Sequence, residues 1–394
     1  MTFGAGSALD YLLSRGLVKE AVIAAGDLSV TETRSLNTSF RVVSRKGPCY
    51  LLKHGGAGVG SSRLAIEASA YACLAGQEPA TLLSRFLPRF YAYAPGLDLL
   101  TLELFPDAET LLDYHLRTGR FPVGFARQMA EALSTLHSLQ VGKPAAGHVP
   151  LPTDPPWALA IHHPGFEMLA KMNNANTRFI SIIQRHPPFE ELLDGLREEW
   201  HAECMVHGDL KWANCLLHSP ASRTATIPEG RHITTNTFLK IVDWEFAALG
   251  DPCWDIGSVF ADYLNLWLRS IPVGEQGSMH GGVDPGGLPA LARFPLETMQ
   301  TAIQAFWEHY CLRSGIDAHV GFVWLARSVR YAAARLLQLG YEQNQVAPAL
   351  PSNMLLLLQL SLNMLQRPLE AAAQLLNIEA WSSVPDRADG RGIS

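Results

Sequence analysis

The spacing of hydrophobic and polar residues predicts an α+β chain that has an opening helix, then short strands, and then a longer helical part. A helix is expected near Ala8 to Leu17, and strands near Ser39–Val43 and Tyr50–Lys53. A further strand, Leu99–Phe105, alternates and ends at Pro106, which cannot donate a hydrogen bond to a sheet. These three predicted strands therefore lie in the N-terminal part of the chain.

Apolar residues at helical spacing predict several helices with a buried face. One helix spans Ser62–Gly76, with Ser61 or Ser62 as the expected N-cap and Gly76 as the stop. Its buried face is expected to carry Leu64, Ala68 and Tyr71. A second helix has its core positions at Phe125, Met129, Ala132, Leu133, Leu136 and Leu139. The most apolar run, Met354–Leu362, is too short to span a bilayer and is expected to be a buried helix.

A short polar stretch carries groups that suit catalysis. His207-Gly208-Asp209-Leu210-Lys211-Trp212-Ala213-Asn214 is followed by an apolar strand that ends at Asp243. A single Asp beside a Gly usually caps a turn or a helix, but phosphoryl transfer needs this ordered set. Asp209 can accept or orient the proton of an acceptor hydroxyl, while Asn214 and Asp243 can supply oxygen ligands for Mg²⁺.

The His-Gly-Asp motif resembles that of the aminoglycoside phosphotransferase and choline kinase family, a branch of the protein-kinase-like fold that replaces His-Arg-Asp with His-Gly-Asp. Gly250–Gly257 is similar to the Gly-Asp-Pro-x-x-Asp-Ile segment of that family. The resemblance implies two lobes: an N-lobe (1–104) with a small antiparallel sheet and a larger, mainly helical C-lobe (105–384), with a flexible tail (385–394). It also implies that the γ-phosphate of ATP is transferred, with Mg²⁺, to a hydroxyl group.

A kinase of this type also needs positively charged side chains that bind the nucleotide phosphates. Lys53 ends a strand and Glu67 lies on the next helix, where each alone is usually just a solvated charge. With the downstream motifs we expect the two to form an ion pair that holds the lysine on the phosphates. Lys211, beside Asp209, is expected to neutralise charge on the γ-phosphoryl group.

The nucleotide is expected to lie between the hairpin before Lys53 and an interlobe hinge. Backbone and side-chain groups of Asn37, Thr38 and Ser39 are the expected donors to the phosphates. Backbone groups of Glu103 and Leu104 are expected to meet adenine. The nearby Gly55–Gly60 lacks the spacing of Gly-x-Gly-x-x-Gly and is expected to be a flexible linker.

Composition narrows the class of protein. The chain has 394 residues, 48% of them hydrophobic, which is enough for two substantial lobes. Its six Cys form no Cys-x-x-Cys pair, as expected for reduced thiols in the cytoplasm. The net charge of −6 offers no basic surface to nucleic acid, and neither a signal peptide nor a membrane-spanning segment is expected.

The resemblance implies that helices of the larger lobe bind the acceptor, here Pro150–Trp200 and Phe294–Asn377. Acidic and basic residues nearly balance from Gln140 to Trp200, which argues against a polycationic aminoglycoside. His162 and His163 are not expected to bind a metal, because adjacent side chains point apart and no third ligand follows at helical spacing. Two polar or glycine-rich segments are expected to be solvated loops or lids, namely Ser219–Thr237 and Ile271–Pro289.

Three functions remain open. The first is an O-phosphotransferase acting on a peptide Ser or Thr, or on the hydroxyl of a metabolite or antibiotic. The peptide is favoured because Arg330–Glu342 and Gln359–Pro368 resemble kinase-like proteins that accompany peptide-modifying enzymes, such as a lyase that removes the phosphate. Arg335 and Glu342 share a helix face and are candidate peptide contacts, although such a face is more often solvated or internally paired. The alternatives are a nucleotide-binding pseudokinase scaffold and another nucleotide transfer, but the intact catalytic set favours a kinase.

Overall fold

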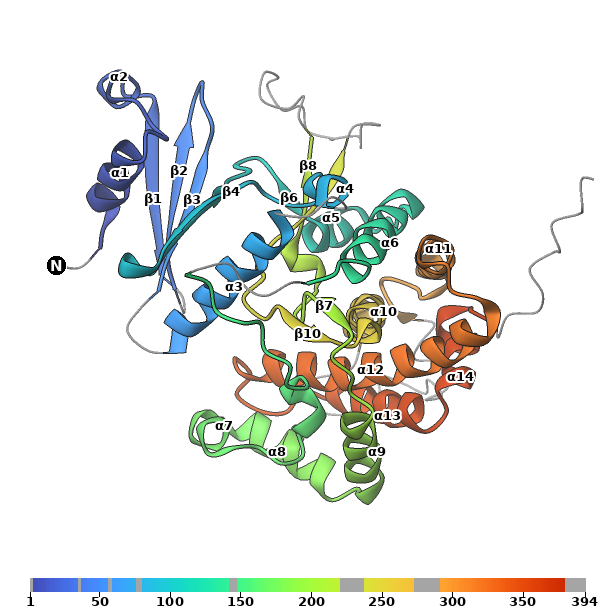
Figure 1. Cartoon of the computed structure of the whole chain (residues 1–394). Coiled ribbons are helices and arrows are strands. Elements are labelled where there is room, and N and C mark those ends of the chain that lie inside the picture. Colours follow the sequence, from blue (N-terminus) through green and yellow to red (C-terminus); the bar gives the residue numbers. More distant parts are fainter. Residues whose placement is uncertain are drawn as a thin grey trace, which may run out of the picture. The chain divides into compact units, whose positions relative to one another are not determined.

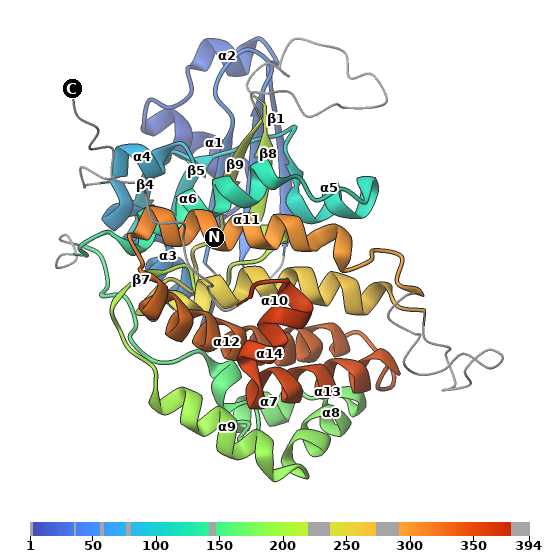
Figure 2. The ribbon, with the colours of Figure 1, turned by 90° about the vertical axis from the view of Figure 1, so that its right-hand side faces the viewer.

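The computed structural model describes residues 3–34, 37–55, 59–75, 80–141, 147–219, 237–272 and 291–379. The chain forms two compact units (Figures 1 and 2). The sheet unit comprises Met1–Thr118, Thr135–Thr153 and Cys204–Leu249, and the helical unit comprises Gly119–Ser134, Asp154–Glu203 and Gly250–Ser394. The segment with the catalytic motifs therefore belongs to the same unit as the N-terminal strands. The lobe boundary expected after residue 104 stays a prediction.

A five-stranded antiparallel sheet forms the centre of the sheet unit, in the order β1-β2-β3-β5-β4 (Figure 1). Its strands are β1 (Leu28–Arg34), β2 (Thr38–Ser44), β3 (Tyr50–His54), β4 (Phe90–Ala94) and β5 (Leu99–Glu103). The elements around it are α1 (Ala5–Ser14), α2 (Glu20–Ala24), α3 (Val59–Ala75), α4 (Ala80–Ser84) and the 3₁₀ turn η1 (Pro95–Leu97). The small antiparallel sheet expected from the sequence is thus confirmed.

The two faces of this sheet differ, because successive residues of a strand point to opposite sides. Phe40 and Leu52 pair across β2 and β3 and lie in a hydrophobic cluster with Leu12 of α1. Ser39 and Lys53 pair one position along and therefore point to the opposite face. Helix α1 covers the first face, whereas Lys53 contacts α3 on the second.

Two shorter sheets carry the catalytic motifs. Strand β7 (Cys204–Val206) pairs with β10 (Ala248–Gly250), and β8 (Cys215–His218) lies between β6 (Glu109–Thr110) and β9 (Phe238–Ile241). The 3₁₀ turn η3 (Trp212–Asn214) leads into β8, and α5 (Leu111–Thr118) follows β6. The loop with Asp209 therefore connects β7 to β8, and Asp243 comes shortly after β9.

The helical unit is built around the long helices α10 (Pro252–Ser270) and α12 (Ala318–Asn344), which contact each other extensively. They approach closely at Gly257, where an added Cβ would lie 2.6 Å from the carbonyl oxygen of Ser328. Figure 2 shows α11, α10 and α12 one beside the next. The unit also contains α6 (Val123–His137), η2 (Trp157–Ala160), α7 (Phe166–Lys171), α8 (Asn174–Gln184), α9 (Pro187–Glu198), α11 (Glu297–Ser314), α13 (Asn353–Gln366), α14 (Pro368–Ala371) and the π-helix η6 (Ala372–Leu376).

Helix α3 is present with the expected buried face but with a different start. Leu64, Ala68 and Tyr71 are buried, as predicted. The helix begins at Val59, so Ser61 and Ser62 lie inside it and the prediction that one of them is the N-cap is wrong. A serine N-cap contributes about 1 kcal/mol, and the tertiary contacts of a helix usually outweigh such a local preference.

Two expectations about the C-terminal helices are wrong. Arg335, a candidate peptide contact, is 1% exposed, because α12 packs against α10, α13 and α14. A side chain buried in this way cannot bind a peptide on the surface. Helix α13 is not buried all round, since Leu355 is 56% exposed while Leu357 and Leu358 are buried.

Several expected segments lie wholly or partly outside the described residues. They are part of Gly55–Gly60, Gly76, most of Ser219–Thr237 and Ile271–Pro289, and the tail 385–394. Among the described helices, none combines the length and the hydropathy needed to cross a membrane.

Candidate active site

Lys53 is the centre of the candidate active site, because it contacts two carboxylates at once. Its Nζ lies 2.9 and 2.8 Å from the two side-chain oxygens of Glu67 and 2.7 Å from Oδ1 of Asp243. Strand β3 supplies Lys53, α3 supplies Glu67, and the segment after β9 supplies Asp243. The expected ion pair between Lys53 and Glu67 is thus present, and it extends to one of the two expected metal ligands.

Burial concentrates charge in this cluster. The side chain of Glu67 is fully buried, and those of Lys53 and Asp243 are 13% and 35% exposed. Burial acts to lower the pKa of Lys53, but the charges of Glu67 and Asp243 outweigh it and raise this pKa. Burial raises the pKa of Glu67 to about 7, with Lys53 acting in the opposite direction. Lys53 therefore pairs with two carboxylates at once, and a divalent cation bound beside them would offset the negative charge that remains.

The loop between β7 and β8 brings the three expected polar groups together. Nζ of Lys211 lies 2.7 Å from Oδ2 of Asp209, whose side chain is 8% exposed. Nδ2 of Asn214 donates to the backbone oxygen of Asp209 at 3.0 Å. This bond uses the amide nitrogen of Asn214, so that its carbonyl oxygen is the atom suited to a metal ion.

Two contacts tie this loop to the segment that carries Asp243. The backbone N–H of Val242 donates to the carbonyl of Asn214 at 2.9 Å. Nδ1 of His207 accepts from the N–H of Asp209 at 3.3 Å, and its Nε2 lies 3.1 Å from the carbonyl of Val242. These contacts assign the ring proton to Nε2. His207 is therefore a positioning residue that holds the loop and the Asp243 segment together.

Two backbone conformations at the site are uncommon. Gly208 has φ +79°, and an added Cβ would lie 2.1 Å from the carbonyl oxygen of Phe246, so only glycine fits. Asp243 has φ 70°, a left-handed conformation that is rare for residues other than glycine. Such conformations persist where surrounding contacts impose them. Here the contact of Asp243 with Lys53 is one of these.

Thr38 and Ser39 were both expected to contact the phosphates, but of these two only Ser39 shares the sheet face of Lys53. Ser39 lies directly opposite Lys53, whereas Thr38 lies opposite His54. Since neighbouring positions alternate between faces, the side chain of Thr38 points away from Lys53. Thr38 can therefore contribute only backbone groups on the Lys53 side.

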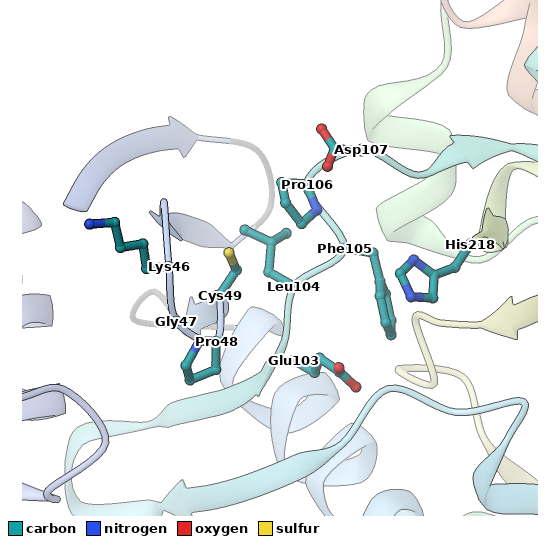
Figure 3. Close-up of a pocket in the computed structure, with 10 residues that line it drawn as sticks. All are labelled: Lys46, Gly47, Pro48, Cys49, Glu103, Leu104, Phe105, Pro106, Asp107 and His218. Atoms are coloured by element: carbon teal, nitrogen blue, oxygen red, sulfur yellow. The ribbon is translucent and has the colours of Figure 1, made fainter. Parts of the chain in front are cut away.

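The expected hinge residues line a pocket of about 430 Å³ (Figure 3). Glu103 and Leu104 line it together with the turn before β3, and the rings of Phe105 and His218 lie 4.7 Å apart. Ligand pockets typically measure about 300–1,000 Å³. The N–H of Leu104 already donates to the carbonyl of Cys49 at 3.0 Å. Adenine would therefore have to use other backbone groups of this segment.

A third carboxylate near Lys53, that of Glu245, was not expected from the sequence. Its side chain is 14% exposed, and its Oε1 lies 3.8 Å from Nη1 of Arg63. The guanidinium of Arg63 also stacks over the ring of Phe246, with its Cζ 4.3 Å from the ring centroid. Burial and the charge of Asp243 raise the pKa of Glu245. The signal that indicates such a residue is the pair of carboxylates directly after one apolar strand, Asp243 and Glu245.

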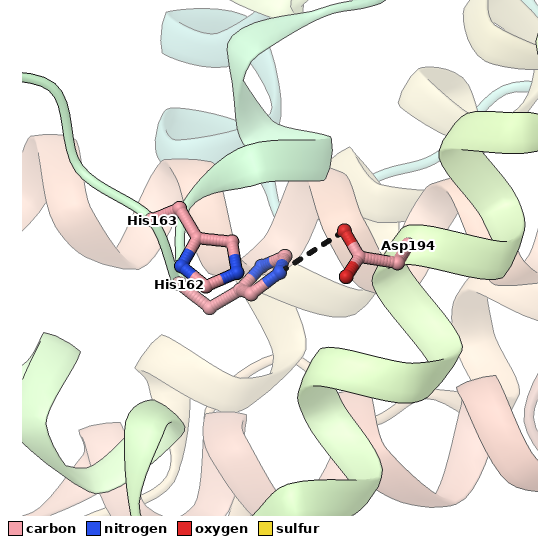
Figure 4. Close-up of side chains that lie close together, drawn as sticks. All are labelled: His162, His163 and Asp194. Atoms are coloured by element: carbon pink, nitrogen blue, oxygen red, sulfur yellow. Dashed lines mark ion pairs between the residues drawn. The ribbon is translucent and has the colours of Figure 1, made fainter.

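The expectation that His162 and His163 point apart is wrong. Their ring centroids lie 4.2 Å apart, and Asp194 of α9 completes a cluster with ligand atoms within 4.8 Å of one another (Figure 4). Asp194 is remote in the sequence, so helical spacing alone could not identify it as the third ligand.

The fold is that of a known class of kinases. The chain is similar to a choline kinase from Cryptosporidium parvum Iowa II, with a TM-score of 0.54 and 14% identity, over 91% of this chain and 94% of that one. A choline/ethanolamine kinase family protein from Mesorhizobium loti has a TM-score of 0.46 and 14% identity over 91% and 94%. No protein-family model matches the chain. The first similarity shows that the chain has a two-lobed, protein-kinase-like fold, as the motifs implied.

In sequence, the chain is similar to a small part of much longer proteins. It is 27% identical to Acyl-CoA dehydrogenase family member 11 of Mus musculus and 28% identical to that of Rattus norvegicus, in each case over 129 residues. The matched segment covers 33% of this chain and 13% of each of those proteins. A match of this extent does not transfer their activity.

Proposed function

We propose that this protein is an ATP- and Mg²⁺-dependent O-phosphotransferase that transfers the γ-phosphate of ATP to an alcohol. The observation that carries the proposal is one network within the sheet unit: Lys53 contacts Glu67 and Asp243, and the Asp243 segment is hydrogen-bonded to the loop of Asp209. Phosphoryl transfer depends mainly on positioning and on charge stabilisation. The network holds the required groups in place through buried contacts.

The nucleotide side of the site follows from the buried charges. Lys53, held by Glu67, binds phosphate oxygens, and Ser39 on the same sheet face donates to them. Asp243 and Asn214 offer the hard oxygen ligands that Mg²⁺ prefers. Mg²⁺ held by these two residues would neutralise charge on the nucleotide phosphates. The pocket along Glu103 holds adenine.

The transfer step uses the two charged residues of the loop. The acceptor oxygen attacks the γ-phosphorus, the bond to the β–γ bridging oxygen breaks, and ADP leaves. Asp209 takes the proton of the acceptor hydroxyl. Lys211, whose Nζ lies 2.7 Å from Asp209, neutralises charge on the transferring phosphoryl group.

A small-molecule alcohol is the acceptor that we place first, and a Ser or Thr of a peptide second. The burial of Arg335 removes one of the two residues that were expected to contact a peptide. The solved structure that shows the fold is named as a kinase of choline, a small alcohol. A peptide acceptor, with a partner lyase acting on the product, rests on the resemblance of the C-terminal segments alone.

Acceptor-dependent turnover of ATP tests the proposal. The full chain would be supplied with Mg·ATP and, separately, with a panel of metabolite alcohols and a panel of Ser and Thr peptides. We expect ADP to form with at least one alcohol, and the Asp209→Asn variant to lose this activity. Nucleotide binding without turnover on either panel would indicate a pseudokinase scaffold and contradict the proposal.

A further inference from the structure

The helical unit contains a cluster of two imidazoles and two carboxylates that phosphoryl transfer does not use. His162 and His163 follow η2, while Glu190 and Asp194 lie one turn apart on α9. Oδ1 of Asp194 lies 3.2 Å from Nε2 of His162. Oε1 of Glu190 lies 3.7 Å from Nε2 of His163. Figure 4 shows the ring of His162 between the ring of His163 and the carboxylate of Asp194.

His162 is the member that indicates a ligand. Its side chain is 2% exposed, whereas those of Asp194 and His163 are 42% and 59% exposed. Among the described residues, neither of its ring nitrogens has a hydrogen-bond partner with acceptable geometry, although Asp194 is close. A buried polar group left in this state is destabilising. A ligand that accepts a nitrogen lone pair would remove this penalty.

The backbone around the two histidines is held in place. Nε2 of Gln184 donates to the carbonyl of His162 at 2.9 Å, and the N–H of His163 donates to the carbonyl of Ala160 at 2.9 Å. Backbone contacts that fix this turn also orient the two imidazoles, and metal-binding histidines are usually oriented by their surroundings in this way.

We propose that His162, His163 and Asp194 bind a divalent transition-metal ion, with zinc as the best match. Two imidazoles and a carboxylate are ligands typical of Zn²⁺, whereas Mg²⁺ prefers oxygen ligands alone. In a tetrahedral site with bonds of about 2.0–2.1 Å, the ligand atoms lie about 3.4 Å apart. The three ligand atoms already lie within 4.8 Å of one another, so small side-chain rotations complete the site. Glu190 or a water molecule supplies the fourth ligand.

Zinc binding by the full chain tests this site directly. The protein, without a polyhistidine tag and stripped of metal by a chelator, would be titrated with Zn²⁺ against a chromophoric competitor in excess Mg²⁺. We expect Asp194→Asn and His163→Gln each to weaken zinc binding by at least about tenfold. Removing a group that merely supports a metal ligand already causes such a loss. Both side chains are partly exposed, so the variants are expected to fold.

The matched control is Glu191→Gln, which removes an exposed carboxylate from the same helix without touching the cluster. It should bind zinc as the unmodified chain does. Co²⁺ should give the visible absorption of a tetrahedral site in the unmodified chain and in Glu191→Gln, but not in Asp194→Asn. The absence of stoichiometric zinc binding, or equal binding by all four proteins, would overturn the proposal.

Discussion

At the scale of single residues, the candidate active site depends on charge-assisted contacts between a few side chains. Lys53 contacts Glu67 and Asp243, and Lys211 contacts Asp209, all at 2.9 Å or less. Contacts of this type are shorter and stronger than hydrogen bonds between neutral groups. Substitutions that remove one charge and keep the fold are therefore the sharpest probes of the site.

The two expected metal ligands should differ in their effect on nucleotide binding. Asp243 is anionic and Asn214 is neutral, so Asp243→Ala should weaken binding of Mg·ATP much more than Asn214→Ala does. Binding of ATP without Mg²⁺ should change little in either variant. Calorimetric titrations with and without Mg²⁺ measure the difference, and equal losses for the two variants would count against Asp243 as the main ligand.

The backbone at Gly208 should tolerate no side chain. Gly208→Ala places a Cβ 2.1 Å from the carbonyl oxygen of Phe246 and also requires φ +79°. Gly315→Ala is the matched control, because Gly315 has φ +65° and open space around it. The control should lose only about 1–2 kcal/mol of stability, from the left-handed conformation. Gly208→Ala should lose more and should also displace the catalytic loop. Equal stability and activity in the two variants would refute this account.

At the scale of helices and strands, the Gly-Asp-Pro segment acts as the start of α10. Oδ1 of Asp251 accepts from the N–H of Cys253 at 2.9 Å, and Pro252 occupies the first turn. Oδ2 accepts from the hydroxyl of Tyr331 at 3.2 Å and lies 3.2 Å from Nε of Arg327. Asp251 therefore caps α10 and joins it to α12 through a fully buried carboxylate.

Removal of this carboxylate should cost much more stability than removal of an ordinary cap. Asp251→Ala deletes the cap and leaves Arg327, 14% exposed, without its partner, and breaking a buried pair costs about 3–5 kcal/mol. Asp317→Ala removes the exposed cap of α12, which accepts from Val320 at 2.9 Å, and should cost about 1 kcal/mol. Urea unfolding of both variants measures the two losses. Similar losses would show that Asp251 acts as a cap only.

The sequence predicted helices and strands well where the spacing of nearby hydrophobic residues determines them. The alternation at Leu99–Phe105 indicated β5, and the buried face of α3 followed from Leu64, Ala68 and Tyr71. The ordered set Asp209, Asn214 and Asp243 predicted one site, and the hydrogen bond from Val242 to Asn214 shows that the two segments lie together. The roles of these residues stay predictions. The start of α3 was missed because the local preference for a serine N-cap, about 1 kcal/mol, is weak.

At the scale of the whole molecule, contacts between remote segments were the ones that could not be predicted. His162 meets Asp194 only because η2 and α9 pack together. Arg335 looked like a surface residue because only the fold shows that α12 is enclosed by other helices. The charge of a residue and its position in the helical repeat do not show which helices pack against each other.

The buried charge of Glu67 should make the stability of the protein depend on pH. Its folded pKa of about 7 lies above the ordinary value of 4.5, so the folded state binds more protons between these values. The contribution of Glu67 is therefore fully present below pH 4.5 and is lost as the pH rises through about 7. The unfolding free energy of the unmodified chain minus that of Glu67→Gln should fall across this window. Urea titrations at several pH values check the sign, and a difference that grows with pH would contradict it.

The fate of the γ-phosphate of ATP tests the central claim most directly. Phosphorus NMR of the full chain with Mg·ATP and the alcohol panel distinguishes a phosphate monoester from inorganic phosphate. We predict that a monoester forms together with ADP. Its rate of formation should fall by about 10²–10⁴ in Asp209→Asn, the usual effect of losing a positioned base. Release of inorganic phosphate alone, or a monoester formed equally fast by Asp209→Asn, would contradict the account.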